Sequence, residues 1–181
     1  AFSLLDTSLD AAVVVELAPG AYTAQVSGKN NTTGVALVEA YDLDEVAGER
    51  RLINISTRAF VGIGDKVLIP GIVVEGTTPK RLLIRAVGPS LQRFGVAGAL
   101  ADPELRVVDG ASQIVARNNN WEQDNPDVTI ASSTAAGAFS LQAGGKDAAL
   151  VVTLRPGLYT VVVSGVGDTT GVALVEVYDV P

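Results

Sequence analysis

The sequence predicts an all-β protein made of antiparallel β-sandwich or jelly-roll units, and three observations carry this prediction. Short runs rich in Val, Ile and Thr recur along the chain and are separated by Gly, Pro and Asp. No stretch shows the apolar spacing of an amphipathic helix between credible caps. Residues 1–44 recur as residues 138–181 at a constant offset of 137, with 27 of the 44 aligned positions identical. A fixed period is typical of an array built from one structural unit.

The strands are expected where an apolar run of 5 to 10 residues lies between turn residues. Residues 1–4 and 138–141 are expected to add short strands, and 90–100 and 127–136 have helical leanings. In chain order the main expected strands are 13–17, 20–27, 35–41, 52–61, 66–74, 81–87, 105–109, 114–117, 150–154, 158–164 and 172–178.

The connections between these runs predict antiparallel pairing. Pro19-Gly20 and Pro156-Gly157 place a fixed φ before a residue that tolerates positive φ, as in a type II turn. Asn30-Asn31 and Gly167-Asp168 are the matching hairpin loops. Parallel strands would need longer crossovers.

The repeat predicts two lobes. Residues 1–97 are expected to form one β-sandwich lobe that contains the first copy of the block (residues 1–44), and residues 98–181 a second that contains the second copy (residues 138–181). The ring pairs of the two copies, Tyr22 and Tyr159, Tyr41 and Tyr178, and Phe2 and Phe139, are expected in cores or corners.

The composition argues against several classes of function. A net charge of −7 disfavours nucleic acid, and no apolar run reaches the length of a membrane span. The chain contains neither Cys nor His, which removes thiolate chemistry and the commonest general base. The acidic residues are spread over turns, so a non-enzymatic protein is expected.

Two sets of segments carry family resemblances. Asp102-Pro103-Glu104-Leu105, the Asn/Asp-rich loop after residue 117, and the run from Pro156 to Gly165 resemble the bacterial pre-peptidase C-terminal domain, a small β-sandwich of secreted proteins. Residues 51–58 and 83–91 are similar to phrases in tandem repeat units of large secreted bacterial surface proteins. These resemblances imply a β-sandwich fold and an extracellular or cell-surface location.

One polar cluster is a candidate metal site. Oxygen ligands at the density found between residues 118 and 127 suit Ca²⁺. The alternative is a long turn whose Asn and Asp side chains cap their own backbone. Trp121, in the same loop, is expected to plug a sandwich core, with a sugar-stacking platform as the alternative. The candidate calcium ligands are Asp102, Asp109, Asn118, Asn120, Asp124 and Asp127.

These features lead to one leading hypothesis and one rival. The leading hypothesis is a non-enzymatic extracellular structural protein, a β-sandwich subunit of a filament, sheath or surface array that polymerises with identical chains through head-to-tail strand or sheet contacts. It depends on the repeat, whose first copy corresponds to only the back half of the lobe expected for residues 98–181, and on strands such as 158–164 that are apolar on both faces. The rival is a calcium-dependent accessory module that binds carbohydrate or a cell surface. Sequons at Asn30, Asn31 and Asn54 leave an attached glycan open.

Overall fold

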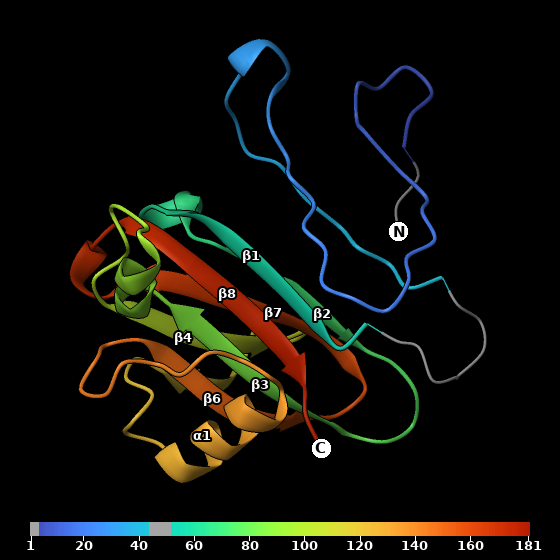
Figure 1. Ribbon diagram of the computed structural model, residues 1–181. Coiled ribbons are helices and arrows are strands. Elements are labelled where there is room, and N and C mark those ends of the chain that lie inside the picture. Colours follow the sequence, from blue (N-terminus) through green and yellow to red (C-terminus); the bar gives the residue numbers. More distant parts are fainter. Residues whose placement is uncertain (1–3, 44–51) are drawn as a thin grey trace. The chain divides into compact units, whose positions relative to one another are not determined.

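The computed structural model describes residues 4–43 and 52–181. The chain divides into two compact units, residues 1–51 and residues 52–181, which are described separately (Figure 1).

The C-terminal unit contains two four-stranded sheets, and every pairing between its named strands is antiparallel. This arrangement confirms the predicted all-β sandwich class. Sheet A has the order β1 (Asn54–Val61), β8 (Gly171–Asp179), β3 (Lys80–Val87) and β6 (Ala148–Leu154). Sheet B has the order β2 (Gly71–Val74), β7 (Gly157–Gly165), β4 (Pro103–Asp109) and β5 (Ile114–Asn118).

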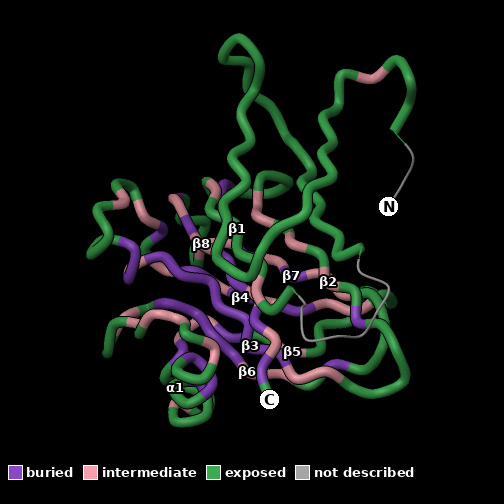
Figure 2. Tube along the Cα trace, turned by 45° about the vertical axis from the view of Figure 1, so that its right-hand side comes forward, coloured by how far each residue is buried: buried purple, intermediate pink, exposed green. Residues whose placement is uncertain are grey.

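The core lies between the two sheets because alternate residues of each strand point inward. In β3, Leu82, Ile84 and Ala86 belong to the main core cluster, together with Val161 and Val163 of β7. Figure 2 shows this burial as purple segments confined to the C-terminal unit.

The other face of sheet A is covered by the chain between β5 and β6. There Leu83 of β3, Tyr178 of β8 and Val180 form a second cluster with Ala136 and Ala138, which follow helix α1 (Pro126–Ala135). Of the two segments with helical leanings, the second therefore forms α1, whereas 90–100 forms only the 3-10 helix η3 (Pro89–Phe94). The expected short strand at 138–141 does not form.

The division into lobes differs from the one expected at residue 97. β1 pairs with β8, β2 with β7, and β3 with both β6 and β8, so all three strands belong to the same sandwich as β4 to β8. Residues 98–181 alone would lack β1 and β3 of sheet A and β2 of sheet B. The unit boundary therefore falls between residues 51 and 52.

The N-terminal unit forms no strand within residues 4–43. Its chain runs extended through the regions predicted as strands 13–17, 20–27 and 35–41, with a bend at Pro19-Gly20 and the 3-10 turn η1 (Lys29–Asn31). The predictions for residues 1–3, including Phe2 and most of the short strand 1–4, fall outside the described residues. A strand exists only when a neighbour accepts its backbone hydrogen bonds, and these segments have no paired strand among the described residues.

Candidate functional site

The two copies of the repeated block share their local backbone structure. Asn30 of η1 has φ 56° and ψ 36°, and Gly167 of the matching 3-10 turn η4 (Val166–Asp168) has φ 63° and ψ 35°. A Cβ atom at Gly28 or at Gly165 would lie 2.0 Å from the carbonyl oxygen of the threonine four residues later, so only glycine fits this loop. The loop geometry therefore belongs to the local sequence.

Two tyrosine hydrogen bonds are duplicated as well. The Tyr22 hydroxyl donates to the Ala18 carbonyl at 2.8 Å, and the Tyr159 hydroxyl donates to the Arg155 carbonyl at 3.0 Å. The Tyr41 hydroxyl donates to Glu39 at 2.8 Å, and the Tyr178 hydroxyl donates to Glu176 at 2.6 Å. Both copies thus form the same local contacts, whether or not a sheet surrounds them.

The two copies differ in their exposure to solvent. Tyr41 is 53% exposed and Tyr178 is 8% exposed. Tyr22 is exposed, whereas Tyr159 is partly buried and packs against the main core. Phe139 is half-buried, between Arg85 and the Phe94 ring. The expectation of buried rings thus holds for Tyr178, holds in part for Tyr159 and Phe139, and is wrong for Tyr22 and Tyr41.

In the second copy, two buried carboxylates bind groups from residues 52–137, which we call the front segment. Asp147 accepts hydrogen bonds from the Gly88 amide at 2.8 Å, the Ser90 amide at 3.2 Å and the Ser90 hydroxyl at 2.5 Å. Glu176 forms an ion pair with Arg85 at 2.8 Å, and both side chains are buried. These contacts offset the cost of burying charge, although Arg85 Nε has no hydrogen-bond partner among the described residues.

The buried cation also fixes the segment over sheet A. The Arg85 guanidinium donates to the Phe139 carbonyl at 2.7 Å and lies 4.5 Å from the centre of the Phe139 ring. Burial raises the pKa of Tyr178 well above its usual value, and the hydrogen bond to Glu176 raises it further. The Arg85, Glu176 and Tyr178 side chains therefore form one buried polar group that joins the front segment to the second copy.

Sequence reasoning did not identify Arg85, Asp147 or Glu176 as important. A signal was present, because Asp10 and Glu39 match Asp147 and Glu176 in the repeated block and Glu39 lies in an otherwise apolar run. The identity of their partner could not be obtained from the repeat, since Arg85 lies outside it.

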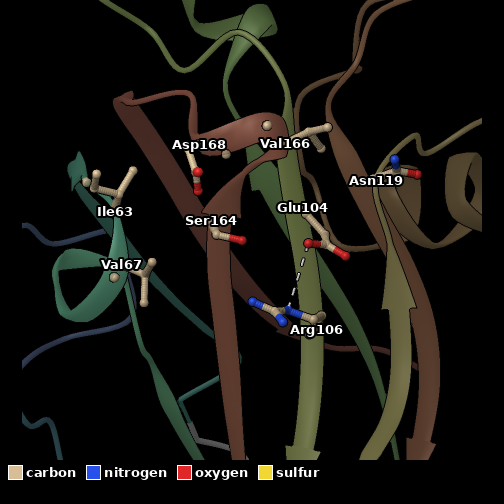
Figure 3. A pocket seen from close by; sticks show the side chains of 12 residues that line it. Ile63, Val67, Glu104, Arg106, Asn119, Ser164, Val166 and Asp168 are labelled. Atoms are coloured by element: carbon tan, nitrogen blue, oxygen red, sulfur yellow. Dashed lines mark ion pairs between the residues drawn. The ribbon is translucent and has the colours of Figure 1, made fainter.

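A groove of about 520 Å³ opens at the end of sheet B beside η4 (Figure 3). Ile63 and Val67 line it from the loop after β1, and Glu104 and Arg106 from β4, where their charged groups lie 3.9 Å apart. Ser164 of β7 and Asp168 of η4 line it between these two groups. Glu104 and Asp168 are its two acidic groups, and Glu104 forms only a long ion pair with Arg106, without a hydrogen bond from Arg106 Nε.

Three of the predicted calcium ligands, Asn118, Asn120 and Asp124, contact one another within one loop. Asn118 and Asp124 are joined, because the Asn118 amide donates to Asp124 at 3.2 Å and to the Asn120 carbonyl at 3.0 Å. The Asn118 side-chain oxygen accepts from the Ala149 amide. These bonds match the alternative reading of the loop as a turn that caps its own backbone.

The other three predicted ligands make other contacts or lie on other elements. Asp102 forms an ion pair with Lys146, and Asp127 lies in the first turn of α1. Asp109 caps the turn after β4 by accepting from the Ala111 and Gln113 amides. It lies about 13 Å along β4 from Leu105, the partner of Asn118, at 3.3 Å per residue. Within the described residues no group of three acidic side chains is placed to hold a metal ion.

Trp121 is buried, as the core interpretation predicted, and its indole N–H donates to the Gln142 carbonyl at 3.2 Å. Its ring is therefore not presented for sugar stacking. Of the sequon residues, Asn54 donates to the Val177 carbonyl within sheet A, whereas Asn30 and Asn31 lie in the exposed η1 turn.

Comparison with known proteins gives one structural likeness. No protein-family model matches the chain, and no curated protein sequence matches it. Among solved structures, the chain is similar to the pre-peptidase C-terminal domain of a collagenase from Bacillus anthracis. The identity is 13% and the TM-score 0.42, over 69% of this chain and 89% of that chain. Across the described residues, no helix combines the length and the apolar character needed to cross a membrane.

Proposed function

We propose that this chain is a non-catalytic structural protein of the cell exterior, a β-sandwich subunit that joins others into a filament, sheath or surface array. The observation that carries the proposal is the exposure of the first copy. Its residues 9–43 are all exposed, although they include the residues that fill a sandwich core in the second copy. Apolar strands without neighbours recruit other chains.

The C-terminal unit offers further apolar surface. Leu158 of β7 and its β2 partner Val73 are exposed on the outer face of sheet B, and Ile55 and Phe60 are exposed on the edge strand β1. A monomeric protein would cover or charge such positions. These side chains support contacts between sandwiches in an array.

The absence of His and Cys from the sequence supports a non-catalytic role. The cell-exterior location is proposed from the sequence resemblance to secreted repeat proteins. The rival function, a calcium-dependent binding module, has less support, because the Asn118 side-chain oxygen already accepts from the Ala149 amide of β6 and its NH2 group donates within the loop.

The test compares the full chain with a chain of residues 52–181 alone, which contains the complete sandwich core. We expect the full chain to form oligomers or fibres at high micromolar concentration, seen by sedimentation velocity and electron microscopy. The shorter chain should associate much less. A full chain that stays monomeric and shows only single particles would overturn the proposed function.

A further inference from the structure

The first copy keeps the inward side chains of three sandwich strands. Thirteen residues of the second copy are buried, and ten of them are identical in the first copy. The other three positions hold Val13, Ala24 and Leu43, all apolar. Replacements are more frequent on outward positions, where Ala21 and Gln25 stand in place of Leu158 and Val162. Residues 10–43 are therefore built to be buried by a partner.

The polar residues among these ten specify the partner. Asp10 corresponds to Asp147, which binds the Gly88 and Ser90 groups, and Glu39 corresponds to Glu176, which pairs with Arg85. A carboxylate in a core is costly unless a partner satisfies it. A partner that buries Asp10 and Glu39 must thus present a cation and a cluster of N–H and O–H donors at the corresponding places.

The front segment presents these groups. It supplies Arg85 and the Gly88–Ser90 turn. It also supplies every strand that pairs with β6, β7 or β8, namely β1, β2, β3 and β4. Residues 1–181, however, contain one front segment and two copies of the repeated block. Exchange of strands between such 181-residue chains leaves half of the copies without a front segment. The partner is therefore an additional front segment.

We propose that residues 10–43 dock as three strands onto a further copy of the front segment and rebuild the same sandwich, with Glu39 on its arginine and Asp10 on its Gly-Pro-Ser turn. This inference rests on the proposed function in one respect, that the first copy is the element that engages a neighbouring unit.

The test is a fused chain in which a copy of residues 52–137 precedes Ala1. The junction is natural, because residue 137 is followed by Ala138, the counterpart of Ala1. We expect amide hydrogen exchange in residues 11–43 to slow by at least about 100-fold relative to the 181-residue chain, towards the protection of residues 148–180, since strand pairing protects amides. Exchange in the fusion as fast as in the original chain would overturn the docking.

Three single variants of the fused chain test the polar recognition, and a fourth is the control. Glu39→Gln and Asp10→Asn should speed exchange across residues 11–43 by at least about 10-fold and leave residues 148–180 unchanged. Glu16→Gln is the matched control, because it removes the same charge at a position whose counterpart, Thr153, is exposed. Replacement of the arginine by Gln in the added segment alone should reproduce the Glu39→Gln result. Equal exchange in all four variants would overturn the assignment of Arg85-type and Ser90-type partners.

The outcomes separate this inference from the proposed function. Protection in the fused chain together with a strictly monomeric original chain would support the docking and overturn the array. Fibres of the original chain together with an unprotected first copy in the fusion would support the array and overturn the docking.

Discussion

Leu17 and Leu154 hold the same position in the repeated block, yet Leu17 is 48% exposed and Leu154 is 3% exposed. The turns beside them, the tyrosine hydrogen bonds and the glycine loops are the same in both copies. The comparison separates two levels of structure. Turns and short-range hydrogen bonds follow from local sequence, whereas strands and cores depend on what the rest of the chain places beside them.

The largest expected difference between the copies concerns the buried ion pair. Glu176→Ala leaves Arg85 buried without its carboxylate and should lower the free energy of unfolding by about 3 to 5 kcal/mol. The matched variant Glu39→Ala should leave it unchanged, because Glu39 is exposed. Trp121 is the only tryptophan and is buried in the sandwich, so its fluorescence during urea unfolding reports on this unit. Equal effects of the two variants would mean that the first copy is packed as well.

The next difference is apolar. Leu154→Ala should cost about 2 to 3 kcal/mol, in the lower part of the range for a core leucine because β6 is an edge strand. Leu17→Ala should leave the tryptophan-detected transition where it is, since Leu17 is half exposed. The two variants remove the same atoms. A loss of stability in Leu17→Ala but not in Leu154→Ala would show that the first copy, not the second, occupies the sandwich.

Local sequence predicted much of the C-terminal sandwich. The strands at 81–87, 158–164 and 172–178 form because their β-branched, apolar pattern suits a buried pleated surface. The expected strand at 66–74 shortened to β2, since its first residues belong to the 3-10 turn η2 (Gly64–Lys66) and an irregular stretch. These deviations occur where turn chemistry outweighs the apolar pattern.

Pairing between distant residues could not be predicted in the same way. β1 pairs with β8, more than 100 residues later, and this register decides that β1 belongs to the second lobe. The same limit applies to the site. The repeat marks Glu39 and Glu176 as a matched pair, but only the register of β3 with β8 brings Arg85 opposite Glu176.

The smallest expected difference is a dependence on alkaline pH, and it compares the two tyrosines that follow these glutamates. In the folded chain, burial and the bond to Glu176 raise the pKa of Tyr178, so the folded state holds this proton more tightly than the unfolded state does. The resulting stability is complete below the unfolded value of about 10 and is lost as the pH rises above it. Tyr178→Phe should lower stability at about pH 8 by roughly 1 kcal/mol, the value of one hydrogen bond. At about pH 11 its deficit should shrink, because the variant has no proton to lose.

The matched control is Tyr41. In Tyr41 the hydrogen bond to Glu39 also raises the pKa, but the side chain is exposed, and Tyr41→Phe should follow the original chain at both pH values. Urea unfolding followed by Trp121 fluorescence at the two pH values measures both variants. A Tyr178→Phe deficit that is the same at the two pH values would show that this hydroxyl is not held in a buried pair with Glu176.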